Sequence, residues 1–78
     1  MSLMKVKVKV MPKSSVFDPQ GEAVAGALRQ MGLEGLNRVR VGKWIELEFE
    51  GKPELAKVEE AARDLLSNPV IEEYELLG

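Results

Sequence analysis

The sequence predicts a small α+β fold with the order strand, helix, strand, helix, strand. Two observations carry this prediction. Apolar and charged residues alternate in the first and middle stretches, as they do in half-buried strands. In two other stretches apolar residues recur every three to four positions, as they do on amphipathic helices. We therefore expect a mostly antiparallel three-stranded sheet with two helices packed on one face.

The first strand is predicted at residues 5–10, where lysine and valine alternate strictly. Met4 extends the apolar phase toward the N-terminus. Pro12 should end the strand, because proline has no backbone N–H to donate to a neighbouring strand. Residues 11–17 are then a short loop.

The first helix should begin after Asp18, a good N-cap, with Pro19 at the first helical position, where its missing N–H costs nothing. Gly32 is a natural left-handed cap at the other end of a helix of about 13 residues. Gly21 and Gly26 lie inside it, where each destabilises the helix by about 1 kcal/mol relative to alanine. Each glycine therefore either allows a close backbone contact or is simply tolerated at its position. The apolar stripe consists of Val24, Ala27, Leu28 and Met31.

The middle strand is predicted as one long strand over residues 38–50, bent at Gly42. Gly42 and Lys43 look like a two-residue hairpin turn, but such a turn would place apolar and charged residues on common faces. A continuous strand keeps the apolar residues together and leaves only Lys43 out of phase. These apolar residues are Val39, Val41, Ile45, Leu47 and Phe49.

A second helix is expected to open at Pro53 and to stop before Pro69, which disfavours helical geometry at Asn68. The simplest role for Asn68 is to stabilise the turn between this helix and the last strand. The last strand, residues 70–77, has no clean alternation, so the sequence leaves its buried face open. The apolar stripe of the helix consists of Leu55, Val58, Ala62 and Leu65.

Charge patterns predict that the first and middle strands are neighbours. One carries lysines on its outer face and the other glutamates, and opposite charges facing each other across two strands are favourable. Two independently solvated faces are the alternative. The residues are Lys5, Lys7 and Lys9 on the first strand, and Glu46, Glu48 and Glu50 on the second.

The length of the middle strand predicts self-association. Thirteen residues span roughly 43 Å, whereas a seven-residue partner spans about 23 Å, so the strand should overhang its own sheet. An unpaired overhang is an edge that proteins normally cover or pair. We expect it to pair with the same strand of a second copy, in a dimer or higher symmetric oligomer with Trp44 near the contact.

Composition excludes most chemistry for the chain itself. The 78 residues contain neither histidine nor cysteine, so the serines have no histidine base and the usual zinc ligands are missing. A net charge of −2 with interspersed signs argues against a nucleic-acid footprint. No apolar run is of membrane-spanning length, and we expect a cytoplasmic protein. We expect a single domain over residues 4–78, with residues 1–3 a remnant of cloning.

Several stretches together resemble the PurS family, the small subunit of phosphoribosylformylglycinamidine synthase. They are residues 65–74, which end a helix at an Asn-Pro turn, and residues 16–21, which open one at an Asp-Pro pair. Further matches lie at residues 12–13, 31–32 and 40–43. Their order, their spacing and the size of the chain match the family over nearly the whole sequence. The resemblance implies a fold related to ferredoxin-like folds.

The resemblance also implies a role in de novo purine biosynthesis. As a dimer, the subunit would bridge a glutaminase subunit and an ATP-dependent synthetase subunit and support ammonia transfer between them. It implies no catalytic residue, no metal and no cofactor on this chain, since ATP and Mg would be used by the synthetase subunit. The candidate interface residues are Lys13, Asp18, Arg40, Lys43, Trp44, Asn68 and Tyr74.

Two other functions use small α+β domains of this kind. A ferredoxin-like domain that senses a small molecule would need a polar pocket at a subunit interface, which the sequence neither shows nor excludes. An RNA-binding sheet would need exposed aromatic residues on its central strands, and charges stand there instead.

Overall fold

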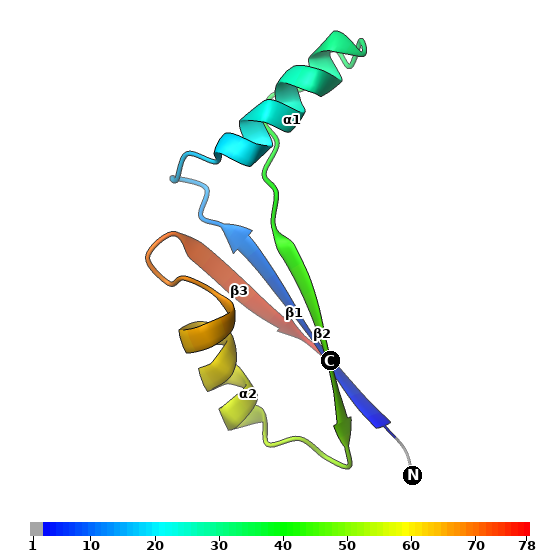
Figure 1. The fold of residues 1–78 in the computed structure, drawn as a ribbon, viewed down its shortest axis with the longest axis vertical. Coiled ribbons are helices and arrows are strands. Elements are labelled where there is room, and N and C mark those ends of the chain that lie inside the picture. Colours follow the sequence, from blue (N-terminus) through cyan, green and yellow to red (C-terminus); the bar gives the residue numbers. More distant parts are fainter. Residues whose placement is uncertain (1–2) are drawn as a thin grey trace.

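The computed structural model describes residues 3–78 and has the predicted order of elements (Figure 1). Residues 1–3 are the expected remnant of cloning. The first two lie outside the described residues, and Leu3 is the first residue of a strand. The elements are β1 (Leu3–Pro12), α1 (Pro19–Gln30), β2 (Lys43–Glu50), α2 (Leu55–Ala61), a π-helical turn η1 (Ala62–Leu66) that continues α2, and β3 (Glu72–Leu77).

The sheet has the order β2-β1-β3, and β1 is antiparallel to both neighbours. Lys5 pairs with Glu48 and Lys7 with Glu46, which confirms the predicted adjacency of the lysine and glutamate faces. β3 pairs only with the second half of β1, from Lys7 to Pro12. The outer edge of β2 has no partner within the described chain.

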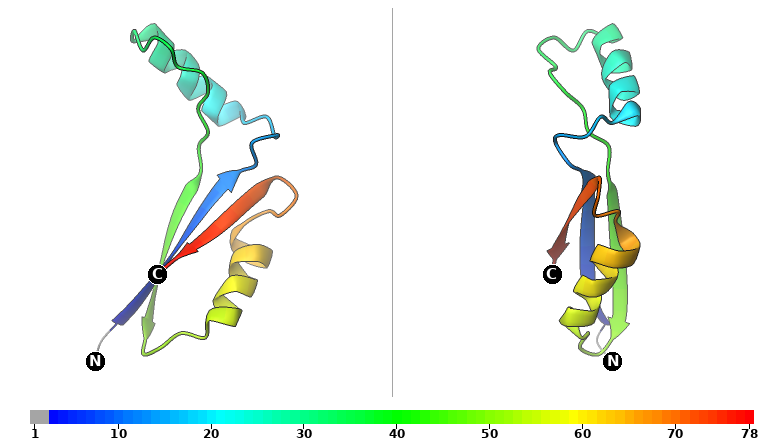
Figure 2. Two further views of the ribbon diagram at one scale, coloured as in Figure 1. Left: turned by 180° about the vertical axis from the view of Figure 1, so that it is seen from behind. Right: turned by 90° about the vertical axis from the view of Figure 1, so that its left-hand side faces the viewer.

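The two helices are placed differently. α2 lies along the sheet, whereas α1 stands beyond its end (Figures 1 and 2). The molecule is consequently elongated, with extents of 49 × 28 × 15 Å. The prediction of an α+β fold with three antiparallel strands and two helices is confirmed, but the expectation that both helices cover one face is wrong for α1 in this single chain. No helix among residues 3–78 is long and apolar enough to cross a bilayer.

The prediction of one long strand over residues 38–50 is wrong for its first part. β2 begins at Lys43, and residues 36–42, which we call the neck, run on from it toward α1 without strand pairing (Figure 1). The reason is that β1 leaves the sheet at Pro12, so no strand of the same chain remains beside the neck. The rejected hairpin is absent from this stretch. A Cβ atom at Gly42 would collide with the carbonyl oxygen of Val10, so glycine lets the neck pass close to β1.

The core lies between the sheet and α2. Three of its residues, Val8, Val10 and Ala62, are completely buried. On β3 the half-buried side is that of Tyr74 and Leu76, which answers the question that the sequence left open. The residues packed against the core are Ile45, Leu47, Leu66, Tyr74 and Leu76.

The second helix buries only part of its predicted stripe. Val58 and Ala62 are buried as expected, but Leu55 and Leu65 are exposed, Leu65 by 80%. The helix begins at Leu55 rather than at Pro53, which leaves Leu55 at its frayed start. The π-helical turn from Ala62 changes the phase of the last residues, so that Leu66 rather than Leu65 packs against the core.

Candidate functional site

The loop after β1, the start of α1 and the neck meet in a joint that Asp18 organises. Asp18 stands at the N-cap position as predicted, but its Oδ2 accepts a hydrogen bond from the backbone N–H of Val41, at 2.8 Å. This bond, together with the N–H groups of Gly21 and Gln20, holds the pKa of the Asp18 carboxyl below its ordinary value. The carboxylate therefore ties the helix start to the neck.

Two arginines of the neck strengthen the joint. Arg38 donates to the carbonyl oxygens of Ser14 and Val16, the latter at 3.1 Å, and Arg40 donates to that of Pro12 at 3.0 Å. Guanidinium groups suit this task because they present several donors in a fixed plane. The loop carbonyls are satisfied by the neck, and the two segments are held together.

Gly21 lets α1 sit directly on the neck. A Cβ atom at Gly21 would overlap the carbonyl oxygen of Val39, whereas one at Gly26 would meet nothing within 4 Å. Of the two alternatives that the sequence left open for these glycines, close contact applies to Gly21 and tolerance to Gly26. Gly32 ends the helix in the left-handed conformation, with φ of 94°, as predicted.

The outer face of the sheet, on the side away from α2, is a network of exposed ion pairs. Lys5 Nζ lies 3.2 Å from a carboxylate oxygen of Glu46 and 3.7 Å from one of Glu48, and Lys9 Nζ lies 3.6 Å from one of Glu75. The hydrogen bond to Glu46 is the main cause that raises the pKa of Lys5. Exposed pairs add little stability, so this network chiefly favours the observed register.

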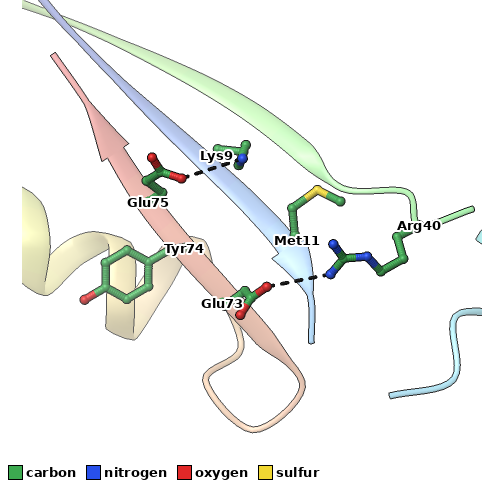
Figure 3. A pocket seen from close by; sticks show the side chains of 6 residues that line it. All are labelled: Lys9, Met11, Arg40, Glu73, Tyr74 and Glu75. Carbon is green, nitrogen blue, oxygen red and sulfur yellow. Dashed lines mark ion pairs between the residues drawn. The ribbon is translucent and has the colours of Figure 1, made fainter. Parts of the chain in front are cut away.

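A shallow cavity of about 410 Å³ opens at the neck end of β1 and β3 (Figure 3). Arg40 reaches over it to Glu73, with 3.7 Å between Nη1 and Oε1, and Lys9 pairs with Glu75 on the same side. The charges are compensated in pairs, and Met11 gives the cavity one apolar wall. Its side chains belong to Lys9, Met11, Arg40, Glu73, Tyr74 and Glu75.

Tyr74 borders this cavity, but its ring points toward the helix (Figure 3). Its hydroxyl donates to a carboxylate oxygen of Glu59 at 3.3 Å. Burial is the first cause that raises the pKa of the Tyr74 hydroxyl, followed by the charge of Glu59. The residue therefore links β3 to α2 and remains protonated at neutral pH.

Asn68 closes the turn between η1 and β3, as predicted. Its Oδ1 accepts from the N–H of Val70 at 3.1 Å, and its N–H donates to a carboxylate oxygen of Glu72 at 2.7 Å. Lys13 lies beside this turn, because its backbone N–H donates to the carbonyl of Ile71. The loop after β1 is thereby tied to the last strand as well as to the neck.

The structure brings some of the predicted interface residues together and separates others. Asp18 and Arg40 meet at the joint, and Arg40 shares the cavity with Tyr74. Lys43 and Trp44 open β2, and the Trp44 side chain is 56% exposed. Their contacts with other chains stay predictions. Sequence reasoning missed Lys9, Glu73 and Glu75 in the cavity, because the last strand has no alternation from which its register could be found.

A second hollow, which we call the groove, lies on the other face of the sheet, between β2 and α2. It has a volume of about 300 Å³ and an apolar floor with one charge of each sign at its rim. Sequence reasoning missed it too, because an amphipathic pattern does not say how much of a sheet one helix covers. Its lining residues are Leu47, Phe49, Glu54, Lys57, Val58 and Ala61.

The joint, the charged face, the cavity and the groove are the surface features that the described residues form. In the part of the chain from residue 3 to residue 78, no group of three or more carboxylates could hold a metal ion. Fold and site together define a small α+β module with a three-stranded antiparallel sheet.

Comparison with known proteins gives the particular family. The chain belongs to the PurS family of phosphoribosylformylglycinamidine (FGAM) synthase, whose sequence model matches residues 5–77. The PurS subunit of this synthase from Bacillus subtilis is 45% identical over 74 residues, which cover 92% of this chain and 88% of the relative. That from Mycobacterium leprae is 39% identical over 72 residues, which cover 92% and 91%.

Solved structures agree with this assignment. A crystal form of Bacillus subtilis PurS superposes with a TM-score of 0.83 at 42% identity, covering 97% of this chain and 96% of the other. The Thermotoga maritima PurLQS structure contains a chain that superposes with a TM-score of 0.81 at 38% identity, covering 99% and 98%. The resemblance found in the sequence is confirmed, as is the class of enzyme, an FGAM synthase, in which the chain is a subunit.

Proposed function

We propose that this chain is a non-catalytic assembly subunit that bridges the glutaminase and synthetase subunits of phosphoribosylformylglycinamidine synthase. The observation that carries the proposal is the nature of its surfaces: a hydrogen-bonded joint, an ion-paired face and an apolar groove, with no nucleophile and base in contact among residues 3–78. It is supported by the PurLQS structure of the relative from Thermotoga maritima, which is 38% identical.

The bridge has a chemical consequence. The reaction uses ATP and glutamine to convert formylglycinamide ribonucleotide to the amidine, with ADP, phosphate and glutamate as the other products. Ammonia released by the glutaminase would be protonated in bulk water and would cease to be a nucleophile. A bridge that keeps water out between the two sites supports its transfer without contributing a catalytic residue.

The bridge is proposed to consist of at least two copies of the chain. The outer edge of β2 offers unpaired backbone groups, and such an edge is normally paired or covered. Trp44 stands exposed at the start of this edge. A symmetric pair presents the same surface twice, which suits a part that connects several larger subunits.

The remaining parts of the proposal follow from the same role. The chain binds no cofactor of its own, while ATP and Mg belong to the synthetase subunit, and the protein acts in the cytoplasm. The surfaces that meet other chains are proposed around Lys13, Asp18, Arg40, Lys43, Trp44, Asn68 and Tyr74.

Reconstitution of the enzyme tests the bridging role. Turnover of the glutaminase and synthetase subunits is measured with glutamine and, separately, with ammonium salt, in the presence and absence of this chain. We expect glutamine-dependent turnover to fall at least tenfold without the chain, and ammonia-dependent turnover to change much less. Equal glutamine-dependent turnover with the chain omitted would refute the proposal.

A small-molecule sensor is the second candidate, and the cavity beside Arg40 favours it. Paired opposite charges such as Arg40 with Glu73 could exchange partners with a zwitterionic ligand. Thermal-shift measurements against amino acids and nucleotides distinguish the two functions. A large shift with one ligand, lost in Arg40→Ala but not in Arg63→Ala, would favour the sensor.

A further inference from the structure

The cavity beside Arg40 is lined by two ion pairs that stand side by side (Figure 3). β3 supplies both carboxylates, Glu73 and Glu75, which lie two residues apart on one face of the strand. Glu75 is paired in register with Lys9 of β1, and Arg40 reaches Glu73 from the neck. A strand rises about 3.3 Å per residue, so the two pairs are about 6.6 Å apart. The cavity therefore offers a cation and a carboxylate at each of two places.

Neither pair is closed by a direct hydrogen bond. Arg40 Nη1 lies 3.7 Å from Oε1 of Glu73, and Lys9 Nζ lies 3.6 Å from Oε2 of Glu75. Hydrogen bonds between N–H groups and oxygen are about 2.7–3.2 Å long in proteins. All four side chains are also partly open to solvent. Each charged group therefore retains donors or acceptors that a ligand in the cavity can use.

The guanidinium group of Arg40 is held in place on one side only. Its Nη1 donates to the carbonyl oxygen of Pro12 at 3.0 Å, whereas its Nη2 and Nε make no hydrogen bond to residues 3–78. A guanidinium presents its donors in one plane and can bind a carboxylate through two of them. Because the bond to Pro12 already orders the side chain, less conformational freedom is lost when a ligand binds. Arg40 is thus prepared to receive a carboxylate.

The balance of charges selects the class of ligand. A phosphate group would meet the repulsion of Glu73 and Glu75, and a polyamine that of Arg40 and Lys9. A zwitterion matches one pair with its own carboxylate and ammonium groups. The second pair needs a group that accepts from Lys9 and donates to Glu75. A neutral carboxamide does both, whereas a second carboxylate has no proton to donate and is repelled by Glu75.

We propose that the cavity binds a free α-amino acid with a side-chain carboxamide. Its α-carboxylate is bound by Arg40 and its α-ammonium by Glu73. Its amide oxygen accepts from Lys9, and its amide nitrogen donates to Glu75. Glutamine fits better than asparagine, because the separation of the two pairs favours the longer side chain, and Met11 offers an apolar wall to its methylene groups. This proposal rests on the sensor function described above and names its ligand, and it is independent of the bridging role.

The single tryptophan of the chain provides a direct test. Trp44 is paired in register with Lys9, and residues paired in this way have Cβ atoms about 4.5–5.5 Å apart. Its fluorescence should therefore change when a ligand binds to Lys9. The chain is titrated with glutamine, glutamate and N-acetylglutamine, and calorimetry repeats each titration. We expect saturable binding of glutamine, and at least tenfold weaker binding of glutamate, which meets Glu75, and of N-acetylglutamine, which has no ammonium group.

Three variants locate the ligand, and each removes one carboxylate that is more than half exposed, so all three should fold. Glu73→Gln should weaken glutamine binding at least tenfold. Glu75→Gln should reduce the preference for glutamine over glutamate at least threefold. Glu48→Gln is the matched control, because it removes the same charge from the same face of the sheet outside the cavity, and it should leave both affinities unchanged.

Several results would overturn the proposal. They are the absence of saturable binding up to about 10 mM glutamine, equal affinities for glutamine and glutamate, and an unchanged affinity in Glu73→Gln.

The outcomes also separate this proposal from the functions proposed above. A thermal shift with a nucleotide and no response to glutamine refutes the proposal and leaves the sensor standing. Turnover that depends on the chain, without glutamine binding to it, refutes the proposal and leaves the bridging role standing. Glutamine binding together with equal glutamine-dependent turnover when the chain is omitted supports the proposal and refutes the bridging role.

Discussion

The two ends of this molecule are stabilised in different ways. At one end the sheet and α2 enclose a small core around Val8, Val10 and Ala62. At the other end α1 rests on the neck through Gly21 and the hydrogen bonds of Asp18, Arg38 and Arg40, with most of its apolar stripe exposed. One end forms a core by itself, and the other is held by hydrogen bonds and leaves an apolar surface exposed. Four substitutions test this contrast.

Val8→Ala should have the largest effect, because it removes two carbon atoms from a completely buried position. We expect a loss of about 2–3 kcal/mol in the free energy of unfolding, from lost burial and the cavity left behind. Urea unfolding followed by circular dichroism measures it. Leu65→Ala is the control: at 80% exposure it should change the free energy by less than about 0.5 kcal/mol. Equal losses would contradict the location of the core.

Gly42→Ala should come next, because its Cβ would collide with the backbone oxygen of Val10, where β2 meets the neck. Overpacking of this kind costs about 1–3 kcal/mol. Gly26→Ala is the matched control: it meets open space inside a helix and should stabilise by about 0.5–1 kcal/mol. Thermal unfolding of both variants shows whether the effects have opposite signs. A neutral Gly42→Ala would mean that the neck and β1 are less close than described.

Asp18→Ala should loosen the joint in a pH-dependent way. Because hydrogen bonds in the folded state lower the pKa of Asp18 below 3.8, its stabilisation is present above the unfolded pKa and is lost as the pH falls through the folded value. The melting temperature of the variant should therefore lie below that of the parent at pH 7, and the gap should close as the pH falls through the lowered pKa of Asp18. Asp18→Asn, which keeps an acceptor without a charge, should show a smaller gap. A gap that widens in acid would contradict this account.

Lys5→Ala should have the smallest effect, since Lys5 and its partners Glu46 and Glu48 are all about half exposed. We expect the melting temperature to fall by at most about 2 °C at low salt, and by less at 1 M salt, where charges are screened. Lys52→Ala, outside the strands, is the control. A fall comparable with that of Val8→Ala would show that the charged face does more than set the register.

Much of the fold could be predicted from local patterns. The alternation of valine and lysine identified β1, the Asp-Pro pair identified the start of α1, and Gly32 identified its end. Opposite charges on two strands were enough to predict that β1 and β2 are neighbours. The cavity at Arg40 could not be predicted in the same way, because it depends on the register of β3, a strand without a clear apolar face.

The sequence by itself determined the kinds and order of the elements, the family and the absence of a hairpin at Gly42, because these depend on residues close together along the chain. Only the tertiary structure decided that α1 stands clear of the sheet, that the Asp18 carboxylate accepts a hydrogen bond from Val41 of the neck, and which face of β3 is buried. The physical reason is that a periodic pattern shows which face of a helix or strand is apolar and tends to be buried. The geometry of the connections decides which other element can pack against that face.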